Sequence, residues 1–218
     1  RIFSQISEAC RSINVSLVGG HTEVTQGLPR PIVVGHMLGE VERDGLVTSS
    51  GAEPGDEILL TKGIAIEGVA LLARGKETHL LEKGYSEEFI ERCKNLIYHP
   101  GISVLEEALI ATRAAKVTSM HDPTEGGLAT GIVELAEASG VGVEVFLDSI
   151  MVYDECRTLC KEFGLDPLGV IASGSLLLTA SPRDAYILRE EFAMRKIDCT
   201  CIGRVVEEEK KRVIVSPD

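Results

Sequence analysis

Residues 116–146, KVTSMHDPTEGGLATGIVELAEASGVGVEVF, contain the pattern that decides the fold. Apolar residues in 116–120 and 143–146 predict two strands, and the periodic apolar positions of 128–139 predict a helix between them. Gly140 directly follows this helix, at the position where helices commonly end. A strand, a turn, a helix and a second strand in this order are typical of an α/β domain.

The same alternation continues on both sides of this stretch. Its spacing predicts strands at 57–61 and 175–180 and helices at 65–74, 87–97, 104–115 and 154–163. Ser181 followed by Pro182 predicts a capped start for one more helix. Residues 197–215 are expected to form strands, and the charged run 207–212 between them is interpreted as a solvent-exposed hairpin turn.

The first part of the chain has a different organisation. The sequence predicts a helix at its start, a short strand at 14–18 and a longer strand at 31–42. A stretch rich in Gly, Ser and Pro then follows at 43–55, and such stretches favour a boundary. We therefore divide the chain into residues 1–45 and residues 46–218, and expect the first segment to be too short for a domain.

Composition and charge exclude several classes of protein. The 218 residues are 44% hydrophobic and 26% charged, which is typical of a globular protein. The net charge of -12 disfavours binding to nucleic acid or to an anionic membrane surface. No apolar stretch is long enough to span a membrane, and the first residues do not resemble a signal peptide. We expect a cytoplasmic protein.

The turn at 121–127, HDPTEGG, is the strongest candidate for chemistry. Gly126 and Gly127 allow backbone N–H groups to approach a bound anion at the helix start. Asp122, Thr124 and Glu125 offer oxygen ligands of the kind that magnesium and its bound phosphates prefer. The alternative is that Asp122 or Thr124 simply caps the helix. The residues alone leave both interpretations open.

A second glycine turn, VGGHTE, follows the predicted strand at 14–18. Gly19, Gly20, His21 and Thr22 form the candidate part of this turn. An isolated Gly-Gly pair is weak evidence for a binding site, and an ordinary turn is the more common explanation.

Other familiar sites are not supported by the sequence. It contains neither a P-loop motif nor a GxGxxG motif at the start of a helix. The spacing of Cys156 and Cys160 on a helix, and of Cys199 and Cys201 on a strand, favours packing in the core over metal binding. The five histidines lie far apart in the sequence and indicate no nucleophilic catalysis.

Several motifs in a fixed order resemble those of the aminoimidazole ribonucleotide (AIR) synthetase superfamily. They are GGHTEVT at 19–25, PGDEILLTKGIAIEG at 54–68, HDPTEGGLATGIVELAEASGVGVEV at 121–145, GVIASGSLLLTA at 169–180 and CIGRV at 201–205. This superfamily includes selenophosphate synthetase, thiamine monophosphate kinase and a carbamoyl dehydratase of hydrogenase maturation. The DPT-x-GG turn is most similar to the hydrogenase-maturation branch.

The resemblance implies a two-domain fold in which a dimerising N-terminal domain and a C-terminal domain with a mixed sheet flanked by helices bind ATP and magnesium. Residues 1–45 would be the end of the first domain, and 46–218 would be the C-terminal domain. It further implies transfer of the terminal phosphate of ATP to a carbonyl-type oxygen of a small-molecule or carbamoyl-type substrate. Asp122 and Glu125 would hold the metal.

The same resemblance assigns the other nucleotide contacts to Thr124, Gly126 and Gly127 and to the turn from Gly19 to Thr22. His21 replaces an aspartate that often holds metal in these proteins. Family members usually carry an upstream pair of acidic residues, and this sequence contains no Asp-Asp pair. We therefore expect a fragment that is inactive by itself. The alternative is a non-catalytic binding or assembly module that keeps the C-terminal fold without a nucleotide site.

Overall fold

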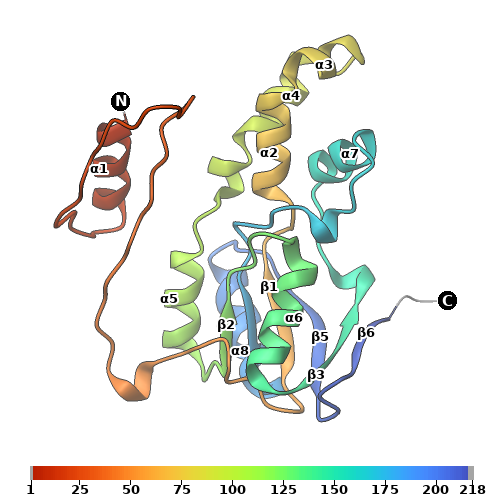
Figure 1. Ribbon diagram of the computed structural model, residues 1–218. Coiled ribbons are helices and arrows are strands. Elements are labelled where there is room, and N and C mark those ends of the chain that lie inside the picture. Colours follow the sequence, from red (N-terminus) through yellow and green to blue (C-terminus); the bar gives the residue numbers. More distant parts are fainter. Residues whose placement is uncertain (1, 216–218) are drawn as a thin grey trace. The chain divides into compact units, whose positions relative to one another are not determined.

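The computed structural model describes residues 2–215 and divides the chain into two compact units, Arg1–Glu40 and Val41–Asp218. The second unit contains a six-stranded mixed sheet with helices around it (Figure 1). The fold is thus the α/β class that the alternation of strands and helices predicted.

The sheet has the strand order β2-β4-β1-β5-β3-β6. Its strands are β1 (Glu57–Thr61), β2 (Ser119–His121), β3 (Gly142–Phe146), β4 (Leu177–Ala180), β5 (Cys199–Val206) and β6 (Arg212–Val215). β1 pairs antiparallel with both β4 and β5, so it lies inside the sheet. β2 and β3 pair antiparallel with β4 and β5, whereas β6 runs parallel to β3.

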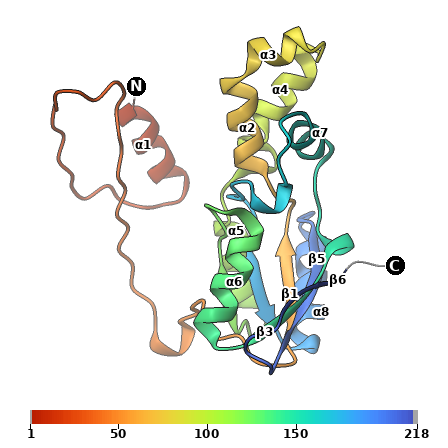
Figure 2. The same ribbon diagram turned by 45° about the vertical axis from the view of Figure 1, so that its right-hand side comes forward.

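The central strand β1 is buried on both faces of the sheet, and its successive side chains point into different cores. Ile58 and Leu60 of β1 pack in one core with helix α6 (Gly127–Ser139). Leu59 points into a second core with α5 (Leu105–Ala114) and α8 (Pro182–Met194). Figure 2 shows the same arrangement after rotation. The three consecutive apolar residues Ile58, Leu59 and Leu60 therefore contribute to the cores on both sides of the sheet.

A third core lies outside these two layers and is built mainly from helices. It joins α2 (Ile66–Gly75), α3 (Glu77–Glu82), α4 (Glu87–Asn95) and α7 (Asp154–Glu162). Cys93, Cys156 and Cys160 are buried in it, as the helical spacing of the last two predicted. α3 is an element that the sequence analysis did not predict.

The first unit differs from the prediction. It contains helix α1 (Ile2–Ser12), but the structure shows no strand at 14–18 or 31–42. Val18, Val34 and Leu38 are 93%, 89% and 85% exposed. A strand needs a neighbour for its backbone N–H and C=O groups. Neither segment has such a neighbour within residues 2–40, and the two strand predictions are wrong for this reason.

The predicted hairpin at 197–215 is also wrong. β5 and β6 are not neighbours, because β3 lies between them and pairs with both. The connection 207–211 therefore crosses the start of β3. A Cβ atom on Gly142 would lie 2.1 Å from the carbonyl oxygen of Glu208, so glycine is needed where the connection passes.

Other predicted elements are confirmed with small differences in their ends. β1 has the predicted bounds, and α6 ends before Gly140, which adopts the left-handed conformation expected of a C-terminal cap. The Ser181 hydroxyl accepts a hydrogen bond from the Asp184 N–H at the start of α8. Among residues 2–215, no helix combines the length and apolar character needed to cross a membrane.

Candidate functional site

The HDPTEGG turn joins the end of β2 to the start of α6 in the second unit. Asp122 and Glu125 are exposed, whereas Pro123 between them is buried. A Cβ atom on Gly131 would lie 2.6 Å from the Pro123 Cβ, so this glycine of α6 lets the turn pack against the helix. The buried proline fixes the turn, and the two carboxylates remain available to solvent.

Two glycines in left-handed conformations bring the backbone into the helix. Gly126 and Gly127 have φ angles of 77° and 68°. A Cβ atom on Gly127 would lie 2.3 Å from the carbonyl oxygen of Leu168 and 2.7 Å from that of Val170. Both the conformation and the space therefore require glycine at position 127.

Neither Asp122 nor Thr124 caps α6 with its side chain. The N-cap residue is Gly126, which has no side chain to offer, and the first turn contains no acidic residue. The Thr124 hydroxyl instead donates a hydrogen bond to the Asp122 carbonyl oxygen at 3.1 Å. The capping interpretation of this turn is wrong, and its carboxylates are not used by the helix.

The loop at 168–174 packs against the turn and is hydrogen-bonded to it. The Thr124 carbonyl oxygen accepts hydrogen bonds from the N–H groups of Gly127 and Ala172, at 3.1 and 3.2 Å. The same loop reaches α2, where the Gly68 N–H donates to the Ile171 carbonyl. Sequence segments that lie more than 40 residues apart thus hold the turn in one conformation.

His121 is a residue of this site that the sequence analysis did not single out. Its Nε2 lies 2.9 Å from Glu134 Oε2, and its Nδ1 lies 3.3 Å from the Ser49 hydroxyl. The Ser49 hydroxyl also donates to the Met120 carbonyl oxygen. These contacts orient the imidazole at the first position of the turn. Glu134 lies on α6, thirteen residues away, so only a prediction of the packed helix could have found it.

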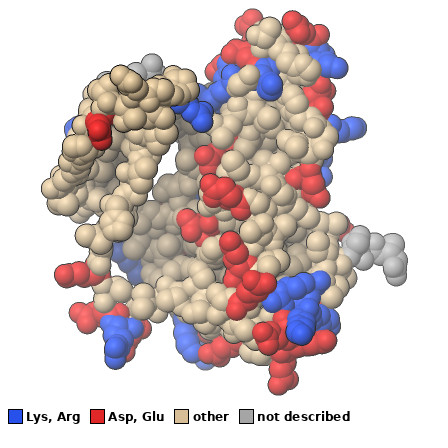
Figure 3. Space-filling model, in the orientation of Figure 1, with Lys and Arg blue, Asp and Glu red and all other residues tan. Residues whose placement is uncertain are grey.

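Acidic residues lie on this turn and farther along α6. Asp122 and Glu125 are exposed on it, and Glu134 and Glu137 are exposed on α6. Figure 3 shows acidic side chains gathered over this part of the second unit. Within residues 2–215, no group of three or more His, Cys, Asp or Glu side chains is arranged to hold a metal ion. A cation at this turn would therefore need further ligands, such as the oxygens of a phosphate.

The second predicted turn lies in the first unit. Gly19, Gly20, His21 and Thr22 are exposed, and no helix or strand includes them. A Cβ atom at Gly19 or Gly20 would meet no atom within 4 Å, so neither glycine is required by close packing there.

The cysteines carry no reactive thiol in the described cores. Burial raises the pKa of Cys93, Cys156 and Cys199 to about 12. A thiol with so high a pKa is protonated at neutral pH and is a poor nucleophile and metal ligand. The packing role predicted for Cys156 and Cys199 agrees with their environment.

A known protein family matches most of the chain. Residues 53–216 match the model of the family described as AIR synthase related protein, C-terminal domain. The chain belongs to this family. The AIR synthase-related match includes the whole sheet up to β6, the loop at 168–174 and the turn at 121–127. The resemblance found in the sequence motifs is confirmed.

Two relatives of the AIR synthase-related chain carry hydrogenase-maturation names. A putative hydrogenase expression/formation protein of Methanocaldococcus jannaschii is 29% identical, over 98% of this chain and 61% of its own length. The carbamoyl dehydratase HypE of Cupriavidus necator is also 29% identical, over 95% of this chain and 57% of its own length. The chain thus spans about three fifths of these relatives.

The fold also matches solved structures. A crystal structure of the hydrogenase maturation protein HypE in complex with ATP has a TM-score of 0.54 and 21% sequence identity. The match covers 81% of this chain and 52% of the solved chain. At this identity the likeness shows that the two proteins share a fold.

Proposed function

We propose that this chain is the C-terminal part of an ATP-dependent enzyme of hydrogenase maturation. The enzyme would transfer the terminal phosphate of ATP to a carbonyl-type oxygen, with a small-molecule or carbamoyl-type substrate. The observation that carries this proposal is the turn at 122–127, whose two carboxylates are free of capping contacts at the start of α6. The relatives named carbamoyl dehydratase and the ATP complex of a HypE protein support it.

The residues of the turn fit magnesium and nucleotide phosphate. α6 is 13 residues long and no side chain caps its N-terminus, so the N–H groups of its first turn, apart from that of Gly127, which donates to the Thr124 carbonyl oxygen, would be available to an anion. Asp122 and Glu125 would hold magnesium as hard oxygen ligands. Gly126, Gly127 and Thr124 would place the backbone next to the phosphates. Bound Mg-ATP would supply the phosphoryl group.

Residues 1–45 would belong to the ATP-binding, dimerising N-terminal domain. The turn from Gly19 to Thr22 would provide further nucleotide contacts, with His21 in place of an aspartate. Within this proposal the active protein is a cytoplasmic homodimer, and the 218-residue chain alone does not turn over ATP.

Binding of Mg-ATP tests the turn directly. Isothermal titration calorimetry of the full-length protein should give a saturable isotherm. Asp122→Asn and Glu125→Gln should each weaken binding about tenfold, since each removes one charged ligand of the cation. Glu137→Gln removes an exposed carboxylate of α6 outside the turn and should leave the affinity unchanged. Equal affinities for all four proteins would contradict the proposal.

A binding or assembly module without a nucleotide site is the second candidate. It is favoured by the absence of a three-ligand metal group among residues 2–215. In that case the full-length protein would show no heat of Mg-ATP binding, and Asp122→Asn would change nothing. The same titration therefore separates the two candidates.

A further inference from the structure

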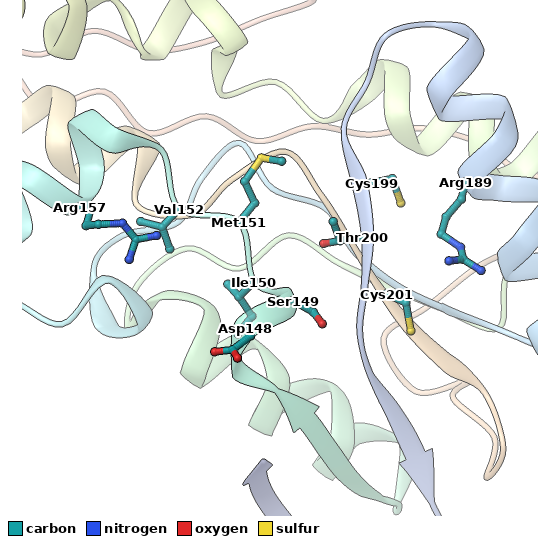
Figure 4. Close-up of a pocket in the computed structure, with 10 residues that line it drawn as sticks. All are labelled: Asp148, Ser149, Ile150, Met151, Val152, Arg157, Arg189, Cys199, Thr200 and Cys201. Atoms are coloured by element: carbon teal, nitrogen blue, oxygen red, sulfur yellow. The ribbon is translucent and has the colours of Figure 1, made fainter. Parts of the chain in front are cut away.

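A cavity of about 580 Å³ lies beside the first residues of β5, away from the turn at 122–127. The segment 148–152, which begins in a short 3-10 helix (Leu147–Ser149), forms its opposite wall, and Arg157 and Arg189 line it from α7 and α8 (Figure 4). It is broadly open to solvent, as a groove along the strand is. Neither the proposed function nor the sequence motifs explain it.

The cavity adjoins an open edge of a strand inside the sheet. One edge of β5 pairs with β1 from Cys199 to Arg204. The other edge pairs with β3 from Gly203 to Val206, because β3 ends at Phe146 and the chain then turns away. Within the described chain, no backbone hydrogen bond joins 147–152 to 199–201. The first part of β5 therefore has a neighbour on one side and the cavity on the other.

The register identifies the backbone groups that face the cavity. The Lys62 N–H donates to the Asp198 carbonyl oxygen at 2.8 Å, across the β1–β5 pair. In an antiparallel pair, alternate residues direct both backbone groups to the same neighbour. Thr200 therefore faces β1 like Asp198, whereas Cys199 and Cys201 direct their N–H and C=O groups toward the cavity.

Side chains with unused donors lie on both faces of this edge. Figure 4 shows Thr200 on one face of β5 and Cys199 and Cys201 on the other, toward Arg189. The Thr200 hydroxyl and the Arg189 Nε are buried atoms without a hydrogen-bond partner in the described chain. Arg189 also forms an ion pair with Glu57, whose Oε2 lies 3.7 Å from Nη2 and is itself buried without a hydrogen-bond partner in the described chain. Buried donors of this kind usually have an acceptor, so ligand oxygens on the two faces of β5 would complete the two groups.

We propose that the open edge of β5 binds an extended peptide segment by strand addition, with one carboxylate side chain directed at Arg189. A peptide strand supplies a donor and an acceptor for each of the two unpaired residues, Cys199 and Cys201, and sends alternate side chains to both faces. A small anion could approach Arg189 but would leave these backbone groups unpaired. Asp148 on the wall favours a peptide with one acid over a run of acids.

Peptides with selective N-methylation test strand addition in the 218-residue chain. The probe is a fluorescein-labelled peptide, Thr-Val-Asp-Val-Thr-Val, measured by fluorescence anisotropy. Two matched peptides carry N-methyl groups on either the odd or the even residues. A strand directs alternate N–H groups to one neighbour. One methylated peptide should therefore bind at least tenfold more weakly than the probe, and the other should stay within about threefold.

A second experiment tests the carboxylate. Arg189→Met keeps an unbranched apolar side chain and removes the donors, and Arg183→Met is a control on the exposed side of α8. Arg189→Met should weaken binding of the Asp peptide about tenfold. It should not affect a peptide with Ala in place of Asp, and Arg183→Met should affect neither. This comparison remains valid for any variant that folds, because the Ala peptide reports on the site itself.

Amide hydrogen exchange measures which backbone N–H groups of β5 the peptide protects. Binding of the probe should slow exchange at Cys199 and Cys201 at least tenfold and leave Thr200 unchanged, since its groups already face β1. The proposal is overturned by an absence of saturable binding, by equal binding of both methylated peptides, or by full displacement of the probe by inorganic phosphate. The last outcome would indicate an anion site at Arg189.

Discussion

The Lys62 Nζ lies 2.7 Å from Glu107 Oε1, and both side chains are almost completely buried. Lys62 follows β1, and Glu107 lies on α5. The lysine also donates to the carbonyl oxygens of Gly101 and Ser103, at 3.3 and 2.8 Å. One ammonium group therefore joins the end of a central strand to the helix that covers the sheet and to the chain that precedes this helix.

Removing one partner of this pair should strongly destabilise the protein. Lys62→Met leaves the Glu107 carboxylate buried without a cation, and we expect the free energy of unfolding to fall by about 3–5 kcal/mol. Urea denaturation followed by circular dichroism measures this change. Lys76→Met, at an exposed lysine, should cost less than about 0.5 kcal/mol. Similar midpoints for the two variants would mean that the buried pair contributes little.

Two glycines with the same backbone conformation should differ in their tolerance of alanine. Gly127→Ala adds a methyl group 2.3 Å from a carbonyl oxygen, whereas Gly140→Ala adds it where no atom lies within 4 Å. Both have φ near 68°, so strain alone should cost each variant about 1–2 kcal/mol. The clash should cost Gly127→Ala about 1–3 kcal/mol more. Thermal denaturation of both variants checks the difference, and equal losses would contradict the packing argument.

The Glu144 ion pairs should make stability depend on pH. Hydrogen bonds from Lys211 and Arg204 lower the pKa of the Glu144 carboxyl below its ordinary value of 4.5. A lowered pKa in the folded state stabilises the protein above the unfolded pKa, and this contribution is lost as the pH falls through the folded pKa.

Glu144→Gln should therefore lower the melting temperature at pH 7, and its difference from the unmodified protein should shrink as the pH falls below 4.5. Glu137→Gln, at an exposed carboxylate of α6, should change the melting temperature little at any pH. A difference for Glu144→Gln that stays constant between pH 7 and pH 3 would show that the charge is not responsible.

The buried thiols should react slowly with iodoacetamide. The pKa of Cys93, Cys156 and Cys199 is raised to about 12, so their thiolate fraction at pH 8 is about a thousandfold below that of a free cysteine. Mass spectrometry of labelled peptides should show slow modification in the folded protein and rapid modification in guanidinium chloride. Rapid labelling of Cys156 in the folded protein would indicate that its core opens often.

Local patterns predicted the elements of the second unit well. The alternation in 57–61 and the periodicity of 128–139 depend on side chains close in sequence, and β1 and α6 follow them. Local patterns did not predict which strands pair with one another. The segment 31–42 has the composition of a strand, but it lacks a neighbour within the first unit and forms none.

The turn at 121–127 likewise combines features that the local sequence predicted with features that only tertiary packing determined. Glycines, a proline and two acids within seven residues sufficed to predict a tight turn that carries two carboxylates. The absence of a side-chain cap, the support from Ala172 and the contact between His121 and Glu134 required the packed loop and helix. The two contacts join residues that lie 13 and 48 positions apart in the sequence.

The sequence by itself determined the class of the fold, the family and the composition of the turn at 121–127, because these depend on local spacing and on motif order. The tertiary structure decided that β6 runs parallel to β3, that Lys62 meets Glu107 and that part of β5 keeps an open edge. Each of these results from chain segments meeting across the fold, where burial and backbone pairing select the partner and local propensity has no influence.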